Sequence, residues 1–205
     1  MSELIEVLTK DGSYSLRSVF FQENFHSLLG ALEETKSKFT ATSNLQRFKG
    51  KSLNVLDICF GLGYNSASLL DELIKQKSFL NLYALEIDKK PLEYSLRNES
   101  FLKLWTPKVK KIFASLYRKN YFEDQFFKCN VLWGDAREKI NIIPSSIKFD
   151  LCLVNSFNKE AELYPKPKHI SKTLIDLPLN LCKFEGAVNF NFVSVNAPIK
   201  LWKFS

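Results

Sequence analysis

The stretch VLDICFGLGYNS, residues 55–66, decides the expected fold of this chain. It combines a buried strand, a glycine turn and the start of a helix. Gly61 and Gly63 can adopt positive φ and let a ligand approach the backbone, while Asn65 and Ser66 are suitable residues at a helix start. Such a turn is a docking point for a nucleotide-like ligand. Because similar turns also occur for purely structural reasons, the rest of the chain has to decide between the two interpretations.

The size and composition predict a single domain. The chain has 205 residues, of which 45% are hydrophobic and 25% charged, enough for one sizeable core. We divide the domain into an N-terminal hairpin and helix extension, residues 1–50, and a Rossmann-like core, residues 51–205. The sequence has no run of about 18 apolar residues that would span a membrane, and its first residues lack the features of a signal peptide. We therefore expect a cytoplasmic protein.

The four cysteines predict neither a metal site nor a disulfide. Each lies in an apolar run, and no two form a CxxC pair: Cys59, Cys129, Cys152 and Cys182. We expect them to be small buried hydrophobic residues.

Basic residues exceed acidic ones and lie in two groups. The 29 Lys and Arg against 22 Asp and Glu give a net charge of +7. The first group contains Lys103, Lys108, Lys110, Lys111, Arg118 and Lys119, and the second contains Lys159, Lys166, Lys168, Lys172 and His169. Such groups suit a polyanion such as RNA. A solvated lysine face that favours solubility is the alternative.

Strands and helices alternate along the core. The patterns predict strands over residues 53–59, 81–87, 126–133, 149–154 and 187–195. They predict helices over residues 65–75, near Pro91, over 102–117, from Ala136 and over 171–182. Before the core, we expect residues 4–20 to form a hairpin and residues 27–38 to form a helix. This alternation predicts an α/β fold, with a mostly parallel sheet and helices on both faces.

Acidic residues follow two successive strands, where ligands of such sheets bind. Asp88 follows the second strand and can accept two hydrogen bonds from a ribose, although a surface acid capping the helix near Pro91 is the alternative. Glu86 is the rival ribose acid, deeper in the sheet. Asp135 follows the third strand and can accept a bond from an adenine amino group, although a plain helix N-cap explains it too. Two acids favour S-adenosylmethionine (SAM) over a dinucleotide, because a sulfonium cofactor has no pyrophosphate to balance.

Several motifs before and after the glycine turn occur in one order. They begin with Asp11-Gly12-Ser13, Leu16, Ser18, Glu23, His26-Ser27, Gly30-Ala31, Glu33 and Phe39, and continue with residues 60–65 and 134–137. This series resembles the MnmC-type tRNA 5-methylaminomethyl-2-thiouridine methyltransferases, which carry a Phe-Gly-x-Gly-x-Asn motif and a Gly-Asp-Ala-Arg stretch. The resemblance covers residues 5–157.

The resemblance implies a class I SAM-dependent methyltransferase fold and methyl transfer to the aminomethyl nitrogen of a modified wobble uridine in tRNA. The implied cofactor-binding residues are Gly61, Gly63 and Asn65 for the methionine part, Asp88 for the ribose and Asp135 for the adenine. The implied substrate-binding residues are His26, Ser27 and Phe157. A hydrogen-bonded structural histidine is the alternative for His26.

Two features depart from the family pattern. The family carries an aspartate after the fourth strand, where this chain has Asn155, which would orient the amine but cannot take up its proton. The family fold also continues past the fifth strand, whereas this sequence ends at Ser205, so the fold is expected to be shortened at its C-terminus. An uncovered fifth strand would be an exposed edge, which the tail or a second copy in a homodimer would cover.

These observations lead to three hypotheses. The first is a SAM-dependent tRNA methyltransferase acting with a separate FAD-dependent oxidase, as fused family members imply. The second is a catalytically impaired RNA-binding or interaction protein with the same scaffold, suggested by Asn155. The third is a methyltransferase for another small amine.

Overall fold

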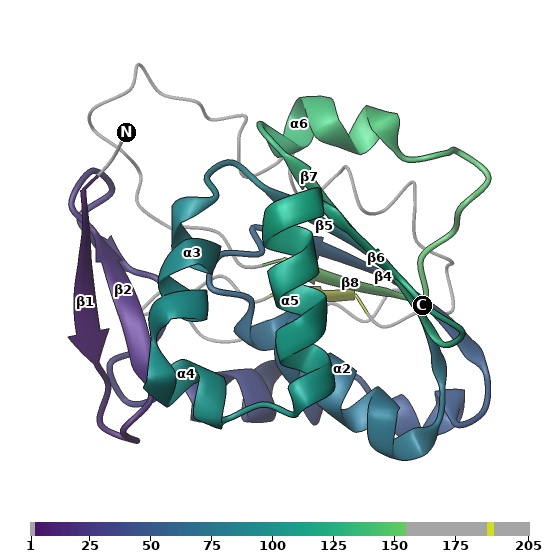
Figure 1. Ribbon diagram of the computed structural model, residues 1–205, viewed down its shortest axis with the longest axis horizontal. Helices are drawn as coiled ribbons and strands as arrows, with labels where there is room; N and C mark the ends of the chain where they lie inside the picture. Colours follow the sequence, from purple (N-terminus) through teal and green to yellow (C-terminus); the bar gives the residue numbers. More distant parts are fainter. Residues whose placement is uncertain (1–2, 155–187, 191–205) are drawn as a thin grey trace.

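The computed structural model describes residues 3–154 and 188–190 (Figure 1). Its described part contains a central sheet with helices against it and a small N-terminal sheet at one side. The α/β fold predicted from the sequence is confirmed. None of its described helices is long and apolar enough to cross a membrane.

The central sheet is mostly parallel. Its described strands are β4 (Ser52–Ile58), β5 (Phe79–Glu86), β6 (Tyr121–Glu123), β7 (Phe127–Trp133), β8 (Leu151–Val154) and β9 (Val188–Phe190). They lie in the order β6-β7-β5-β4-β8-β9, and only the β6–β7 pair is antiparallel among them. The sequence patterns predicted the parallel strands but not β6, which is too short to show a periodicity.

The strand register brings several strand ends to one edge. Ile58 of β4 pairs with Leu85 of β5 and with Val154 of β8, and Glu86 pairs with Trp133. From β4 the chain moves outward to β5 and β7, and then returns to β8 on the other side of β4. This reversal places the end of β4 at a switch in strand order, where ligands of open α/β sheets bind.

Helices cover both faces of the sheet. One face carries α2 (Tyr64–Gln76), α3 (Lys90–Arg97), α4 (Glu99–Lys103) and α5 (Pro107–Lys119). The other carries the short α6 (Ala136–Lys139) and a 3₁₀ turn, η3 (Ile140–Ile142). The single helix expected over 102–117 is divided, because Thr106 caps α5 through its side chain and Pro107 occupies the first helical position.

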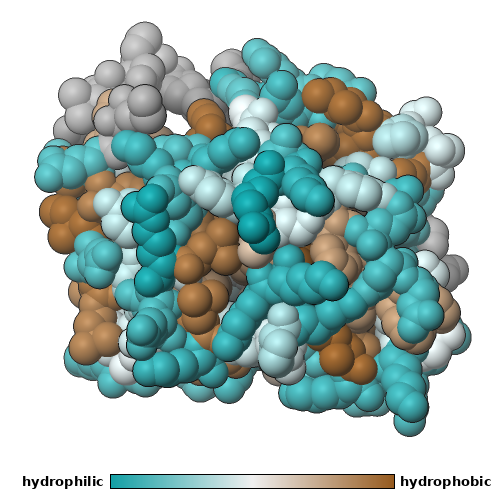
Figure 2. Space-filling view, in the orientation of Figure 1, coloured by the Kyte–Doolittle hydropathy of each residue, from teal (hydrophilic) through white to brown (hydrophobic). Residues whose placement is uncertain are grey.

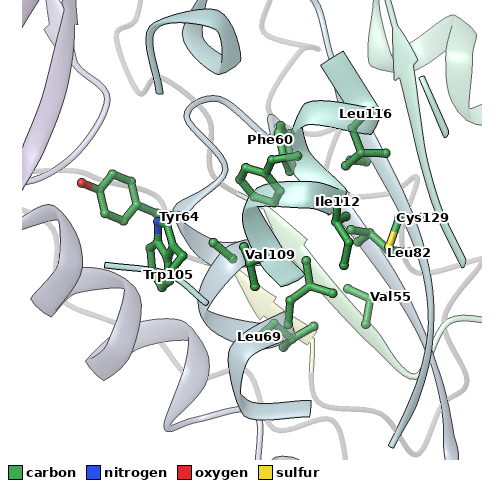
Figure 3. Packing of buried hydrophobic residues seen from close by; sticks show 14 of the residues in the cluster. Val55, Phe60, Tyr64, Leu69, Leu82, Trp105, Val109, Ile112, Leu116 and Cys129 are labelled. Carbon is green, nitrogen blue, oxygen red and sulfur yellow. The ribbon is translucent and has the colours of Figure 1, made fainter. Parts of the chain in front are cut away.

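Side chains of α2 and α5 pack against the sheet in the larger of the two core clusters (Figure 3). Val109, Ile112 and Leu116 of α5 are fully buried and belong to one cluster with Leu82 and Cys129 of the sheet. Because strand residues alternate between faces, the next residues in the strands supply a smaller cluster beneath α6. Burial of each such aliphatic side chain contributes about 1.5–3 kcal/mol.

The N-terminal extension contains the predicted hairpin. Strands β1 (Leu4–Leu8) and β2 (Tyr14–Ser18) pair antiparallel, and β3 (Glu23–Asn24) adds to β2. The expected helix over 27–38 begins later, as α1 (Ala31–Glu34), and continues as a π-helix, η1 (Thr35–Thr40). A 3₁₀ turn, η2 (Leu45–Phe48), leads into β4.

Asp11 joins the hairpin turn to the start of α1. Its Oδ1 accepts hydrogen bonds from Ser13 N and Oγ at 2.9 and 2.6 Å, and its Oδ2 accepts one from Glu33 N at 3.0 Å. Partial burial opposes ionisation, but the hydrogen bonds from Ser13, Thr9 and the backbone hold the pKa of Asp11 at about 2. A Cβ at Gly30 would lie 2.2 Å from Asp11 Oδ2, so this contact requires glycine.

The cysteines are only partly as expected. Cys59 and Cys129 are free, whereas Cys152 is disulfide-bonded to a partner outside the described residues. The expectation that no cysteine forms a disulfide was therefore wrong for Cys152, because apolar surroundings do not prevent pairing. Within residues 3–154 and 188–190 no group of His, Cys, Asp and Glu side chains could hold a metal ion.

Two predicted features lie outside the described residues. These are the helix over 171–182 and most of the strand over 187–195, of which β9 is the described part. The homodimer through the edge of that strand therefore stays a prediction.

Gly63 provides a test of the packing around the glycine turn. A Cβ there would lie 2.4 Å from Phe113 Cε2, and φ is +86°. We expect Gly63→Ala to lower the free energy of unfolding by about 2–4 kcal/mol, measured by urea denaturation. The matched control is Gly50→Ala, where φ is +70° but a Cβ would meet nothing within 4 Å; it should cost about 1 kcal/mol. Equal losses in the two variants would contradict the packing argument.

Candidate functional site

A cavity of about 330 Å³ opens at the carboxyl edge of the sheet. Its walls come from the N-terminal sheet, the glycine turn after β4, the end of β5 and the loop after β7. The polar and turn residues that line it include His26, Gly61, Asn65, Glu86, Asp88, Asp135 and Arg137. The structure therefore brings together most of the residues that the sequence singled out.

The glycine turn is held by β5. Cys59 N and Phe60 N both donate to Leu85 O, at 3.0 and 3.1 Å. Cys59 itself has φ 62°, so a cysteine adopts the left-handed conformation that usually favours glycine. Gly61 follows with φ 57° and lines the cavity.

Gly63 lies on the core side of the turn and does not contribute to the cavity lining. It precedes α2 with φ 86° and faces the rings of Phe113 and Phe60. Its requirement for glycine therefore comes from packing as well as from backbone conformation.

Glu86, the last residue of β5, connects the turn to the next loop. Its Oε2 accepts a hydrogen bond from Gly61 N at 2.8 Å, and its Oε1 accepts bonds from Ile87 N and Asp88 N at 2.7 and 3.1 Å. The residue is only 8% exposed. Burial raises the pKa of Glu86, although the three N–H donors act in the opposite direction.

Asp57 lies one strand away and was not assigned by the sequence analysis. It is 1% exposed, and its Oδ2 accepts a hydrogen bond from Ser66 Oγ at 2.5 Å. Its Oδ1 has no hydrogen-bond partner among the described residues. Burial, together with the nearby Glu86, raises the pKa of Asp57 to about 7. An acid inside the otherwise apolar run of β4 was the signal that could have identified it.

Asp88 and Asp135 both line the cavity. Asp88 is half-buried, and its Oδ1 accepts a hydrogen bond at 3.0 Å from the N–H of Lys90, the first residue of α3. Asp135 caps α6 through Arg137 N at 2.9 Å and is paired with the Arg137 guanidinium. This pairing with Arg137 lowers the pKa of Asp135. The helix-capping alternative is therefore part of the observed structure at Asp135, whereas the N-cap position of α3 is Lys89.

Asn65 and His26 form the wall contributed by α2 and the N-terminal extension. Asn65 is buried, and its Oδ1 accepts a hydrogen bond from Thr35 Oγ1 at 3.2 Å. His26 is also buried, with its Nδ1 3.0 Å from Ser15 Oγ and its ring against Tyr64. Burial lowers the pKa of His26 to about 4, so the ring is neutral at physiological pH.

The remaining predicted residues are not in the described cavity wall. Ser27 lies beside His26 but stabilises a local turn, with its Oγ accepting from Leu29 N and its N donating to Glu34 Oε2 at 2.7 Å. Asn155 and Phe157 lie outside the described residues. Asn155 directly follows Val154, the end of β8.

The electrostatics of the cavity suit a cationic ligand with hydroxyl groups. Glu86 and Asp88 line it and form no ion pair among the described residues, and Asp57 lies behind Glu86. The guanidinium of Arg137 is paired with Asp135. Among the described residues, a pyrophosphate would meet these acids without a free partner charge, whereas a sulfonium group and a ribose would find an anion and hydrogen-bond acceptors. The carboxyl groups of the cavity thus fit the sulfonium group and the ribose hydroxyl groups of SAM.

Comparisons with curated proteins and with solved structures both give matches to this chain. No protein-family model matches the chain. An uncharacterized protein of Methanocaldococcus jannaschii is 27% identical over 208 residues, which cover 95% of this chain and 54% of the relative. The chain thus spans about half the length of that relative.

One structural neighbour is MnmC2 from Aquifex aeolicus. The match has a TM-score of 0.70 and 25% identity, and it covers 92% of this chain and 59% of the neighbour. An rRNA methyltransferase, AviRa from Streptomyces viridochromogenes, aligns with a TM-score of only 0.32, which supports no argument. The likeness to MnmC2 confirms the resemblance seen in the motifs. The chain has the class I fold of an MnmC-like methyltransferase domain.

Proposed function

We propose that this protein transfers a methyl group from SAM to an aminomethyl nitrogen of a modified wobble uridine in tRNA. The observation that carries the proposal is the acid-lined cavity at the glycine turn, within a fold shared with MnmC2. The tRNA part rests on the motif resemblance and on the basic groups of the sequence. A separate FAD-dependent oxidase would act on the same nucleoside.

The chemistry needs a neutral amine held in line with the methyl group. SAM supplies an electrophilic methyl group on a positively charged sulfur. The chain's part is to bind and orient, because the amine lone pair has to point along the methyl–sulfur bond. Asn155 would accept a hydrogen bond from the amine through its carbonyl oxygen. It cannot remove the proton, so solvent or another group would receive it.

The residues of the glycine turn would hold the cofactor. Gly61 would let the methionine part approach the backbone, with Asn65 beside it and Gly63 fixing the turn from the core side. Asp135 would accept from the adenine amino group with the oxygen lone pairs that Arg137 leaves. His26, which is neutral and anchored by Ser15, would shape the substrate side of the cavity.

We assign the ribose to Asp88, because no described residue uses its Oδ2 as a hydrogen-bond acceptor and it lines the cavity. Glu86, whose two oxygens serve backbone N–H groups, would hold the turn in shape. We expect Asp88→Asn to weaken SAM binding about tenfold or more in calorimetry without changing Tm. Glu86→Gln should lower both affinity and Tm. If Glu86→Gln lost SAM binding at an unchanged Tm while Asp88→Asn bound SAM normally, the ribose would have to be assigned to Glu86 instead.

Buried acids also predict a pH dependence of cofactor binding. The pKa of Asp57 is about 7, above the 3.8 of an exposed aspartate, so folding favours its protonated form and stability is lost as the pH rises through 7. A bound cation favours the carboxylate and therefore releases a proton. We expect SAM affinity to rise between about pH 6 and pH 8, by up to about tenfold.

Calorimetry at pH 7 in two buffers with different ionisation enthalpies measures this proton release. Asp57→Asn should reduce the number of protons released, and the difference between the two proteins isolates Asp57 from the amino group of SAM. Equal proton release by the two proteins would exclude Asp57 as the source.

The methyl-transfer reaction itself tests the function. Protein, labelled SAM and tRNA bearing the aminomethyl precursor should yield labelled tRNA, whereas tRNA without the aminomethyl group should not be labelled. Asn155→Ala should lower kcat by about tenfold or more, since it removes the group that orients the amine. Asn155→Asp should retain or increase activity. No SAM binding and no methyl transfer by the wild type would refute the enzyme hypothesis.

A catalytically impaired RNA-binding protein is the second candidate, favoured by the amide at position 155. It predicts that the wild type binds SAM or tRNA without turnover and that Asn155→Asp creates methyl transfer. Methylation of free amines, without salt-dependent tRNA binding, would instead indicate a small-molecule methyltransferase.

A further inference from the structure

We infer that a groove between α5 and β6, separate from the cofactor cavity, binds the phosphate backbone of the substrate RNA. This inference rests on the proposed RNA substrate and identifies where the RNA lies. The groove is lined by Lys111, Ser115, Arg118, Lys119 and Tyr121–Asp124, and it measures about 440 Å³. In Figure 2, drawn in the orientation of Figure 1, hydrophilic side chains lie over α5 on this face.

Ion pairs distinguish the cations of this surface from one another. Among the described residues, Lys103 pairs with Glu99, and Lys108 pairs with Asp124 while lying over the rings of Phe122 and Phe127. Lys111, Arg118 and Lys119 form no ion pair there, and all three are exposed. Of the six basic residues in the first group of the sequence, these three are therefore the ones that line the groove and offer charge to a partner there.

The acids of the groove are already neutralised. Asp124 is occupied by Lys108, and Glu123 lies 4.0 Å from Lys128. Hydrogen bonds from Phe126 N and Phe127 N also hold Asp124 Oδ1, at 3.0 and 2.9 Å. The groove thus presents a net positive charge, although two carboxylates lie in its wall.

Two of the three cations lie on one line along the helix, and Lys119 lies beside Arg118 at its C-terminal end. Lys111 and Arg118 are seven residues apart, which places them on the same face and about 10 Å apart along the axis. Ser115 lies between them, and its Oγ donates to Tyr121 O at 2.6 Å, which fixes β6 against α5. A row of cations on a rigid helix suits the repeated charges of a nucleic-acid backbone better than a single anion.

An aromatic side chain at the groove edge favours RNA over an acidic protein. Tyr121 lines the groove and is 37% exposed. An exposed ring beside a cationic groove is a platform on which an unpaired base can stack. RNA recognition commonly combines such stacking with backbone contacts.

The groove leads toward the cofactor cavity. Because α5 runs toward the carboxyl edge of the sheet, Lys119 lies near the edge at which the cavity opens. Asn120 Oδ1 accepts from Trp133 Nε1 at 2.8 Å and from Lys89 Nζ at 3.4 Å. Lys89 directly follows Asp88 and Trp133 directly precedes Gly134, and both Asp88 and Gly134 line the cavity. An RNA strand in the groove would therefore pass close to the opening of the site.

A charge-matched pair of triple variants tests the inference. The first combines Lys111→Gln, Arg118→Gln and Lys119→Gln in the full chain. The second combines Lys49→Gln, Lys51→Gln and Lys148→Gln, three exposed residues near the amino ends of β4 and β8. Both lose three positive charges, so they differ only in place. Fluorescence anisotropy with labelled tRNA at several salt concentrations measures affinity and its salt dependence.

We expect the groove variant to bind tRNA about tenfold to a hundredfold more weakly, with a salt slope reduced by about 2 to 3. The control variant should stay within about threefold of the wild type. Tyr121→Ala should weaken binding several-fold at an unchanged slope, and Tyr121→Phe, which keeps the ring, should restore it. Calorimetry with SAM should give wild-type affinity for every variant.

Equal weakening by the two triple variants would show that net charge alone acts and would overturn the groove. Binding of poly-glutamate, but not of tRNA, in a manner lost in the groove variant would show that the partner is an acidic protein. Wild-type tRNA affinity in the groove variant would also overturn the inference while leaving methyl transfer intact. Failure of the wild type to methylate tRNA, with groove-dependent tRNA binding retained, would refute only the proposed function.

Discussion

The hydrogen bond from Gly61 N to the buried carboxylate of Glu86 is the constraint on which the rest of the site depends. It ties the turn after β4 to the end of β5, and the same carboxylate collects the next two N–H groups of the loop. Burying this acid costs free energy that three donors only partly offset. The turn, the strand end and the start of α3 are thus arranged around a buried carboxylate, and Asp57 adds a second buried carboxyl group on the neighbouring strand. A cation bound in the cavity would stabilise the ionised forms of both carboxyl groups.

The N-terminal motif has a different basis. Asp11, Ser13 and Gly30 form a compact joint between the hairpin and α1, in which Ser13 Oγ also accepts from Ala31 N at 2.9 Å. None of the three lines the cavity. Their effect is to place the segment that carries His26 against Tyr64 and α2. The residues that made the sequence recognisable in this region therefore position the site, while His26 reaches it.

Long, strongly periodic segments could be predicted from the sequence. The parallel strands, α2 and the hairpin follow from local patterns, and their order places the glycine turn and the acids at one edge. The strand β6 depends on pairing with β7, which no local window contains, whereas Thr106 and Pro107 are a local signal for the start of α5. Asp57 was missed because its significance comes from burial beside Glu86, and the disulfide of Cys152 because pairing depends on distance in space. Likewise, only the structure shows which of the described lysines form ion pairs and which can offer their charge to a partner.

The two glycines of the turn are needed for different structural reasons. Gly61 lines the cavity, and a Cβ there would make ordinary contacts, the nearest with Phe25 at 3.4 Å, whereas a Cβ at Gly63 would enter the rings of Phe113 and Phe60. A lineage that abandoned the cofactor would still be selected to keep the second glycine for folding, while the first would be freer to drift. Motif searches that score both positions together would label such a descendant as active. In a set of diverging sequences with this fold, lost catalysis would be indicated by a change at position 61 while glycine is retained at position 63.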